Sequence, residues 1–268
     1  MTENKNSAGF LENGIPYNRY GHGARPLIVF QGLMFENKPA QGSLGFGYRF
    51  LEDEYTVYVA LRKPCLPVGY TMKDMSDDYA AMIREEFGGP VDVIGISTGG
   101  SIVQHFAADH PDLVRRLVIH SSAHELSETA KREQLRIADF AARRRWVQAY
   151  RVIMDMVMPS KGFKGILTWP LRALASVLMG WFAAPEDPSD LVITVEAEDK
   201  HAFKERLGEI SSPTLVIAGE KDPFYTPALF RETAEGIPNA KLVLYENMGH
   251  PAGGKPFQQE VLTFLQEA

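Results

Sequence analysis

The chain has 268 residues, of which 45% are hydrophobic and 10% aromatic, enough for a sizeable core in one domain or in one domain with an inserted subdomain. Its net charge of -6, without a basic block, argues against nucleic acid as a partner. A single cysteine, Cys65, excludes an intramolecular disulfide, and the first ten residues lack the basic-then-apolar pattern of a signal peptide, so we expect a cytoplasmic protein.

The first hundred residues alternate between strand-like and helix-like patterns. Strands are predicted at 25–32, 55–62 and 91–96, where short runs of β-branched and aromatic residues stand between turn signals. Residues 71–89 predict a helix that ends at two glycines. Its apolar residues recur at helical spacing: Met75, Tyr79, Met82 and Ile83.

The alternation continues to the C-terminus, with one interruption. A helix is predicted from residue 100 to the His110-Pro111 step, followed by a strand at 115–122. Later come strands in 214–219 and 240–250 and helices in 226–238 and 256–268. This order predicts an α/β protein with a mostly parallel central sheet flanked by helices on both faces.

Between about 124 and 200 the alternation stops, and the chain becomes helical and rich in Met, Trp, Leu and Arg. We interpret this stretch as a helical lid inserted into a core of residues 1–123 and 201–268. Its longest apolar run, 165–182, is interrupted by Pro170 and Arg172, so we predict no membrane span. It fits a helix pair or a Pro-interrupted helix that covers an apolar surface. Contact with a membrane surface is the alternative.

The segment GISTGG, residues 95–100, places a serine between glycines directly after a predicted strand. The glycines would allow a sharp turn from strand to helix, with Ser97 strained and exposed at its apex. A Gly- and Ser-rich loop that only ends a strand is the alternative interpretation, and this motif alone does not decide between them.

Two further residues follow predicted strands and should reach the same edge of the sheet. Asp222 follows the strand at 214–219, and His250 follows the last strand. A serine hydroxyl becomes a nucleophile when an imidazole takes its proton and a carboxylate orients and stabilises that imidazole. Ser97, His250 and Asp222 are therefore the candidate catalytic residues, with Glu125 as the alternative acid.

The sequence resembles the α/β-hydrolase superfamily, in particular its lid-bearing single-domain members. These include small esterases, lactonases, cofactor-free haloperoxidases and carbon–carbon bond hydrolases. The serine, aspartate and histidine follow the chain order of that fold. The matching segments are GIPYNRYGHG as the opening hairpin, IVFQG as the oxyanion strand, GISTGG as the nucleophile turn, PTLVIAGEKDPF as the acid strand and NMGHPAG as the histidine turn.

The resemblance implies that Ser97 is the nucleophile, Asp222 the acid and His250 the base, with the backbone N–H groups of Leu33 and Thr98 as the oxyanion hole. It implies no metal and no organic cofactor. Two positions depart from the family pattern: Gln31 stands where histidine usually precedes glycine, and Ile96 stands where histidine usually precedes the nucleophile.

The function implied is that of a serine hydrolase that cleaves a small, largely apolar ester, lactone or thioester through an acyl-enzyme. Carbon–carbon cleavage, perhydrolysis and receptor-like ligand binding with little turnover are the alternatives. The lid would supply an apolar wall to the pocket, unless these side chains form the core of the lid itself. The candidates for pocket lining are His124, Trp146, Met154, Met158 and Trp181.

Overall fold

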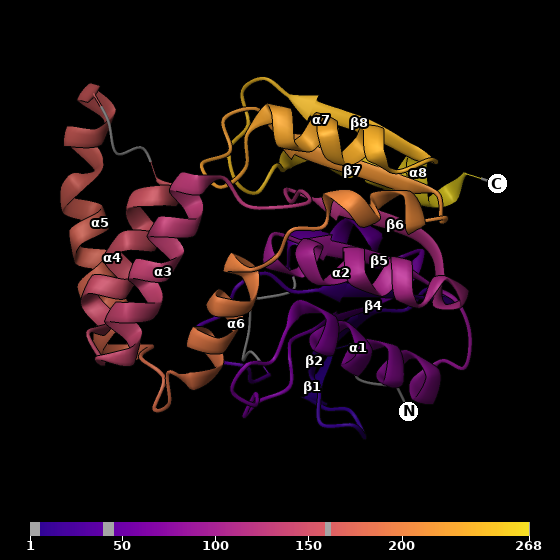
Figure 1. Ribbon diagram of the computed structural model, residues 1–268, viewed down its shortest axis with the longest axis horizontal. Coiled ribbons are helices and arrows are strands. Elements are labelled where there is room, and N and C mark those ends of the chain that lie inside the picture. Colours follow the sequence, from indigo (N-terminus) through magenta and orange to yellow (C-terminus); the bar gives the residue numbers. More distant parts are fainter. Residues whose placement is uncertain (1–5, 40–45, 159–161, 268) are drawn as a thin grey trace.

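The structure is a computed structural model that describes residues 6–39, 46–158 and 162–267. Eight strands form a single sheet in the order β1-β2-β4-β3-β5-β6-β7-β8 (Figure 1). β1 pairs antiparallel with β2, and β2 with β4, while all other neighbours are parallel. The strands are β1 (Ser7–Phe10), β2 (Pro16–Gly21), β3 (Arg25–Phe30), β4 (Tyr55–Ala60), β5 (Val91–Ile96), β6 (Val114–His120), β7 (Thr214–Gly219) and β8 (Ala240–Tyr245). The predicted mostly parallel sheet is confirmed.

The central strands are apolar on both sides because helices cover both faces of the sheet. In β3, Ile28 and Phe30 face one apolar core, while Leu27 and Val29 face the other. This period of two is the geometry of a pleated strand. It explains why the central strands appear in the sequence as continuous Val and Ile runs.

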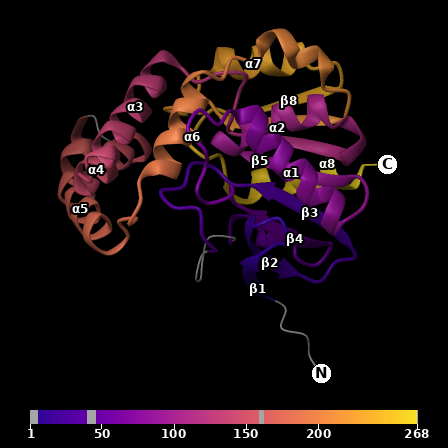
Figure 2. The ribbon, with the colours of Figure 1, turned by 60° about the horizontal axis from the view of Figure 1, so that its bottom comes forward.

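Helices lie in a layer on each face (Figure 2). The first layer contains α1 (Met72–Glu86), α2 (Thr98–Asp109), the short helices η2 (Pro111–Leu113) and η3 (Lys204–Glu209), and α7 (Pro227–Gly236). α8 (Gly254–Gln266) and the short helix η1 (Phe46–Leu51) cover the other face. The helices predicted from periodicity in 71–89 and after residue 97 are confirmed by α1 and α2.

Among the described residues, four α-helices lie between β6 and the short helix η3: α3 (Glu128–Ala142), α4 (Trp146–Val157), α5 (Gly162–Phe182) and α6 (Ser189–Asp199). α3, α4 and α5 pack together beside the sheet (Figures 1 and 2). We call these four helices the insertion. Within the insertion, α6 connects the other three helices to the rest of the chain. Its Leu191 and Val195 pack with α3 and α4, whereas Ile193 and Ala197 pack in the core with α1 and α2. The sequence analysis placed the end of the lid at residue 200, directly after α6. This helix contributes side chains both to the core of the insertion and to the core beside the sheet.

The apolar run at 165–182 forms part of one helix rather than a helix pair. α5 continues through Pro170, and the buried side chain of Arg172 forms an ion pair with Asp155. Within the described residues, no helix is both long enough and apolar enough to span a membrane.

Candidate active site

Ser97 occupies the junction between β5 and α2. Its backbone has φ 52° and ψ -124°, a conformation that residues with a side chain rarely adopt. Nearby glycines make the tight turn possible. A Cβ atom on Gly99 would lie 1.9 Å from the Phe30 carbonyl oxygen, and one on Gly95 would lie 2.6 Å from the Gly99 carbonyl oxygen. The glycines therefore allow α2 to approach the sheet closely and place Ser97 at the sharp turn.

Ser97, His250 and Asp222 form a continuous hydrogen-bonded chain. The Ser97 Oγ atom lies 3.0 Å from His250 Nε2, and His250 Nδ1 lies 2.7 Å from Asp222 Oδ2. Because a carboxylate only accepts hydrogen bonds, His250 donates from Nδ1 and accepts from the Ser97 hydroxyl at Nε2. The Asp222 side chain is fully buried, and that of His250 is 9% exposed. The structure thus brings together the three residues that the sequence analysis selected.

Asp222 is held in place by the loop that follows β7. Its Oδ1 atom accepts hydrogen bonds from the backbone N–H groups of Phe224 at 2.8 Å and Tyr225 at 3.2 Å. The other oxygen is left for His250. Glu125 lies elsewhere: its carboxylate contacts Lys131 at 3.1 Å and His124 at 3.8 Å. Asp222, rather than Glu125, is the carboxylate that faces the imidazole.

The backbone beyond His250 is fixed to the end of β6. The Ala252 N–H group donates to Ser121 Oγ at 3.0 Å, and His120 Nε2 donates to the Ala252 carbonyl oxygen at 2.8 Å. Tyr48 completes the chain by donating its hydroxyl hydrogen to His120 Nδ1 at 2.8 Å. Burial lowers the pKa of His120 to about 3, so this imidazole is neutral at pH 7. The sequence analysis did not anticipate these contacts, because their partners are far apart along the chain.

A buried arginine holds the loop after β3. Arg62 is 1% exposed and donates hydrogen bonds of 3.0 Å to the carbonyl oxygens of both Gln31 and Gly32. In a trans peptide the C=O and N–H groups point in opposite directions, so the Gly32 carbonyl bound to Arg62 turns the Leu33 N–H away from the guanidinium. This loop lies against the serine, since a Cβ on Gly32 would be 3.2 Å from Ser97 Cβ.

A buried glutamate lies beneath the turn at Ser97. Glu198, on α6, accepts hydrogen bonds from Thr98 Oγ1 at 2.7 Å, Ser101 Oγ at 3.2 Å and the Tyr225 hydroxyl at 3.4 Å. Gln134 also donates a side-chain hydrogen bond to it. Burial raises the pKa of Glu198, while these donors oppose that shift. The first turn of α2 is therefore tied to the insertion, a connection that no pattern in the sequence indicated.

A cavity of about 200 Å³ opens at Ser97. α3 contributes Gln134, and α4 contributes Ile153 and Val157. The remaining lining residues come from the end of β5 and from the loops around the serine: Gln31, Gly32, Leu33, Met34, Ile96, Ser97, Phe224, His250 and Pro251. The walls are largely apolar, and the side-chain amides of Gln31 and Gln134 lie among them.

The predicted pocket-lining residues were wrong: none of the five is among the residues that line this cavity. His124 is buried and pairs with Thr233, Trp146 packs in the core of the insertion, and Trp181 is 72% exposed. On α4 the cavity is lined by Ile153 and Val157, one turn apart. Met154 is one residue further along the helix than Ile153, which rotates its side chain about 100° away from that face. Met158 follows the last residue of α4 and has an extended backbone.

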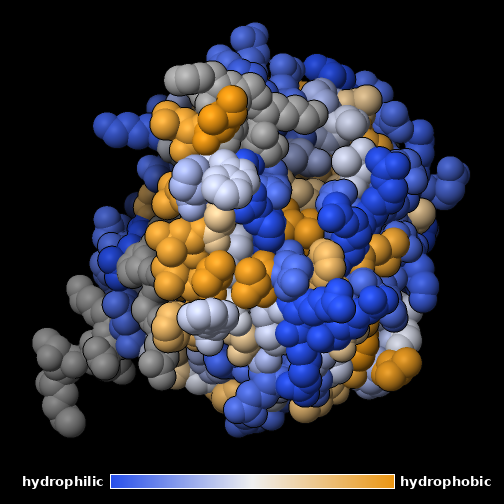
Figure 3. All heavy atoms as spheres, turned by 90° about the vertical axis from the view of Figure 1, so that its left-hand side faces the viewer, coloured by the Kyte–Doolittle hydropathy of each residue, from blue (hydrophilic) through white to orange (hydrophobic). Residues whose placement is uncertain are grey.

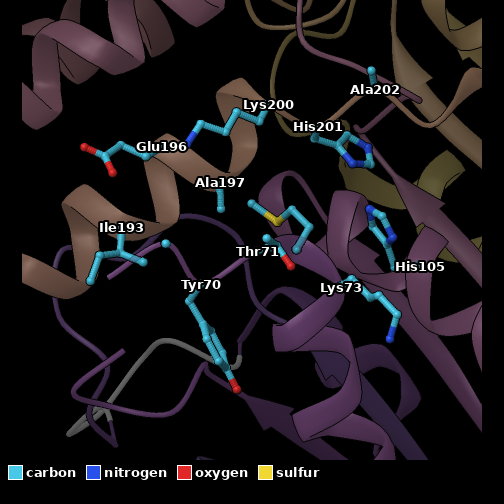
Figure 4. A pocket seen from close by; sticks show the side chains of 12 residues that line it. Tyr70, Thr71, Lys73, His105, Ile193, Glu196, Ala197, Lys200, His201 and Ala202 are labelled. Atoms are coloured by element: carbon cyan, nitrogen blue, oxygen red, sulfur yellow. The ribbon is translucent and has the colours of Figure 1, made fainter. Parts of the chain in front are cut away.

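A second cavity, of about 180 Å³, lies between α1, α2 and the C-terminal end of α6 (Figure 4). His105 and His201 point toward one another there, with ring centroids 5.4 Å apart. Burial lowers the pKa of His105 to about 4 and that of His201 to about 3, so both rings are neutral at pH 7. Ser97 does not line this cavity.

Several known proteins are similar in sequence to this chain. A poly(3-hydroxyalkanoate) depolymerase of Ectopseudomonas oleovorans is 28% identical over 184 residues, which cover 60% of this chain and 55% of that protein. A 2-hydroxy-6-oxononadienedioate/2-hydroxy-6-oxononatrienedioate hydrolase of a Pseudomonas species is 24% identical over 281 residues, covering 96% and 93% of the two chains. The chain thus spans about half of the depolymerase and nearly all of the second hydrolase.

Solved structures share the fold. MGS-M2, an alpha/beta hydrolase enzyme from a Medee basin deep-sea metagenome library, superposes with a TM-score of 0.81 at 18% identity, covering 98% of both chains. The enol-lactonase of Burkholderia xenovorans LB400 gives a TM-score of 0.73 at 18% identity, covering 97% of this chain and 100% of the other. The family model described as "Alpha/beta hydrolase family" matches residues 8–259. The chain therefore belongs to the alpha/beta hydrolase family, as the resemblance in its sequence indicated.

Proposed function

We propose that this hydrolase is a serine hydrolase with Ser97 as its nucleophile, His250 as its general base and Asp222 as the acid that orients the base. The observation that carries the proposal is the pair of hydrogen bonds, 3.0 Å from Ser97 Oγ to His250 Nε2 and 2.7 Å from His250 Nδ1 to Asp222 Oδ2. Such a chain can remove the serine proton as the hydroxyl attacks a carbonyl carbon.

The reaction has two stages. Ser97 Oγ bonds to the carbonyl carbon while its proton passes to His250. His250 then gives that proton to the leaving group, whose bond to the carbon breaks, and an acyl-enzyme remains. Water next loses a proton to His250 and attacks the acyl carbon, and the protonated imidazole returns the proton to Ser97 Oγ as the acid product leaves.

The charge that develops on the substrate oxygen needs donors beside the serine. We assign this role to the backbone N–H groups of Leu33 and Thr98. Thr98 is the first residue of α2, where N–H groups lack partners within the helix and the helix dipole is positive. For Leu33, the support is the hydrogen bond by which Arg62 holds the Gly32 carbonyl of the same peptide unit, so that the Leu33 N–H points away from the guanidinium.

The cavity supports a small, largely apolar ester, lactone or thioester as the substrate. Its volume is about 200 Å³, and Ile153, Val157 and Phe224 contribute apolar walls. We further propose that residues 124–200 form a lid, since α3 and α4 supply one side of this cavity. Lactone and polyester substrates occur among the relatives named above. Cleavage of a carbon–carbon bond is the second candidate, favoured by the likeness to the hydrolase of 2-hydroxy-6-oxononadienedioate.

The first experiment is labelling with a fluorophosphonate followed by intact-mass spectrometry, with Ser97→Ala as the matched control. We expect one adduct on the wild-type protein and none on the variant. An unlabelled but folded wild-type protein would contradict an activated serine. Hydrolysis of a series of short-chain p-nitrophenyl esters, compared with cleavage of a vinylogous diketone, then separates ester from carbon–carbon specificity.

A further inference from the structure

The outer face of α5 carries a continuous apolar stripe. Figure 3 looks onto this side of the molecule, where apolar side chains form a band. Six large side chains, each between 46% and 82% exposed, make up what we call the α5 stripe: Leu167, Leu171, Leu174, Leu178, Trp181 and Phe182. At 100° per residue these positions fall within about 100° of the helix circumference. The stripe is therefore one face of the helix, and Ile166 and Trp169, which are also exposed, lie outside it.

The opposite face of α5 is already occupied. Arg172 and Ser176 are buried, and a Cβ atom on Gly180 would lie 2.6 Å from Val147 Cγ2 on α4. This close contact fixes the orientation of α5, so the helix cannot turn its stripe inward without losing its packing on α4. α5 is also the helix of the insertion furthest from the sheet (Figure 1). The stripe consequently faces away from the rest of the chain.

The spacing of the stripe is that of a helix that pairs with another helix. Leu167, Leu171, Leu174, Leu178 and Trp181 are separated by four, three, four and three residues. Alternation of three and four residues is the a/d pattern by which paired helices interlock their side chains.

We propose that the α5 stripe is a homodimer interface in which α5 packs antiparallel against α5 of a second copy of the chain. A two-fold axis near Leu174 would place the leucine end of the stripe in one copy against the Trp181 and Phe182 end in the other. Both copies would then use the same surface, as a symmetric dimer requires. The six side chains are each 46% to 82% exposed, and an interface of ordinary size, which buries about 800 Å² on each partner, would cover them.

Charge favours a second copy over a lipid surface. A helix that lies in a membrane interface has a polar face rich in Lys and Arg. The charged residues of α5 are Lys164, in its first turn, and Arg172, which is buried and paired with Asp155. The net charge of -6 also opposes approach to an anionic membrane. The dimer is independent of the proposed serine chemistry.

Oligomeric mass is the first test. We expect sedimentation equilibrium to give twice the monomer mass of 29.9 kDa for the wild-type chain. Leu174→Glu would place two carboxylates near the two-fold axis and should weaken dimerisation by about 100-fold or more. The matched control is Val68→Glu, since Val68 is 94% exposed outside the stripe and this variant should remain dimeric. Circular dichroism checks that both variants are folded.

Cross-linking tests the antiparallel geometry. With Cys65→Ser as background, Leu174→Cys near the axis should be joined to its counterpart by a short bismaleimide. Trp181→Cys should not, because antiparallel pairing separates its two copies by roughly 20 Å. A wild-type chain that is monomeric at its highest soluble concentration, or a Leu174→Glu variant as dimeric as wild type, would overturn the proposal. So would a monomer that binds phosphatidylcholine vesicles through the stripe, which would assign this face to a membrane.

Discussion

Glu198 on α6 accepts a hydrogen bond of 2.7 Å from Thr98 Oγ1, the residue directly after Ser97. One hundred residues of sequence separate the two, and the contact joins the last helix of the insertion to the turn that presents the serine. Ser101 and Tyr225 donate to the same carboxylate. A displacement of α6 would therefore disturb the serine turn directly, so the insertion is mechanically coupled to the proposed nucleophile.

Removing this carboxylate should destabilise the protein. Glu198→Ala leaves the hydroxyl groups of Thr98, Ser101 and Tyr225 without their buried acceptor, and we expect a loss of about 3–5 kcal/mol in the free energy of unfolding. Glu198→Gln keeps the shape and one acceptor oxygen, so its loss should be smaller, about 1–2 kcal/mol. Urea denaturation measures both. Equal losses for the two variants would show that the hydrogen bonds contribute little.

The sheet and the proximity of three candidate site residues could be predicted from the sequence for one physical reason. Parallel strands bring their carboxyl ends to the same edge, so Ser97, Asp222 and His250, each placed just after a strand, had to meet there. Arg62 and Glu198 gave no comparable signal. Charged residues are usually exposed, and only the three-dimensional contacts reveal that these two are buried supports of the loop and the turn.

The pocket walls could not be predicted from hydrophobicity. α4 has apolar residues on several faces, because it packs against both α3 and α5 while also reaching the cavity. A pattern of apolar residues therefore did not show which face meets the cavity at Ser97, and the interpretation selected Met154 and Met158 instead of Ile153 and Val157. Cys65 illustrates the same limit of local reasoning, since a residue type that is commonly buried is exposed here.

Arg62→Lys should impair turnover more than substrate binding. Lysine retains the positive charge but cannot hold the Gln31 and Gly32 carbonyls together as the guanidinium does. The Leu33 N–H should then lose its fixed direction, and we expect kcat to fall about 10-fold or more with a smaller change in KM. Steady-state ester hydrolysis measures this, with the exposed Arg143→Lys as control. A change confined to KM would argue against a positioning role.

Buried neutral histidines should make the folded state sensitive to acid. The pKa of His201 is about 3 in the folded chain, against about 6.5 when unfolded. Between these values the unfolded state binds a proton that the folded state does not, so stability falls as the pH decreases from 6.5. At pH 5 the effect of His201 should approach about 2 kcal/mol.

His201→Phe should remove this contribution. Phenylalanine can keep a ring stacked on Phe203, the neighbour of His201, without an ionisable nitrogen. Unfolding free energies at pH 8, where the histidine is neutral in both states, give the pH-independent effect of the substitution. Relative to that offset, the variant should gain stability over wild type as the pH falls to 5. Parallel pH curves for the two proteins would contradict the burial of a neutral imidazole.

Gln134 should select substrates that donate a hydrogen bond. It is 2% exposed, lines the cavity at Ser97 and donates its amide N–H to Glu198. Its Oε1 atom has no hydrogen-bond partner within the part of the chain that the structure describes. A buried acceptor of this kind gains free energy when a ligand supplies a donor. If the proposed function holds, an ester with a hydroxyl group on its acyl chain should be cleaved faster than its deoxy counterpart.

The comparison of two substrates on two proteins tests this selectivity. We would measure kcat/KM for a p-nitrophenyl 3-hydroxyacyl ester and for the matching unsubstituted ester, with wild-type chain and with Gln134→Leu. Leucine removes the acceptor at similar size, so the preference for the hydroxyl ester should fall about 10-fold to 100-fold, while the unsubstituted ester is cleaved at least as well. Because each protein serves as its own reference, a general loss of activity cancels from the ratio. An unchanged ratio would mean that the Gln134 oxygen does not meet the substrate.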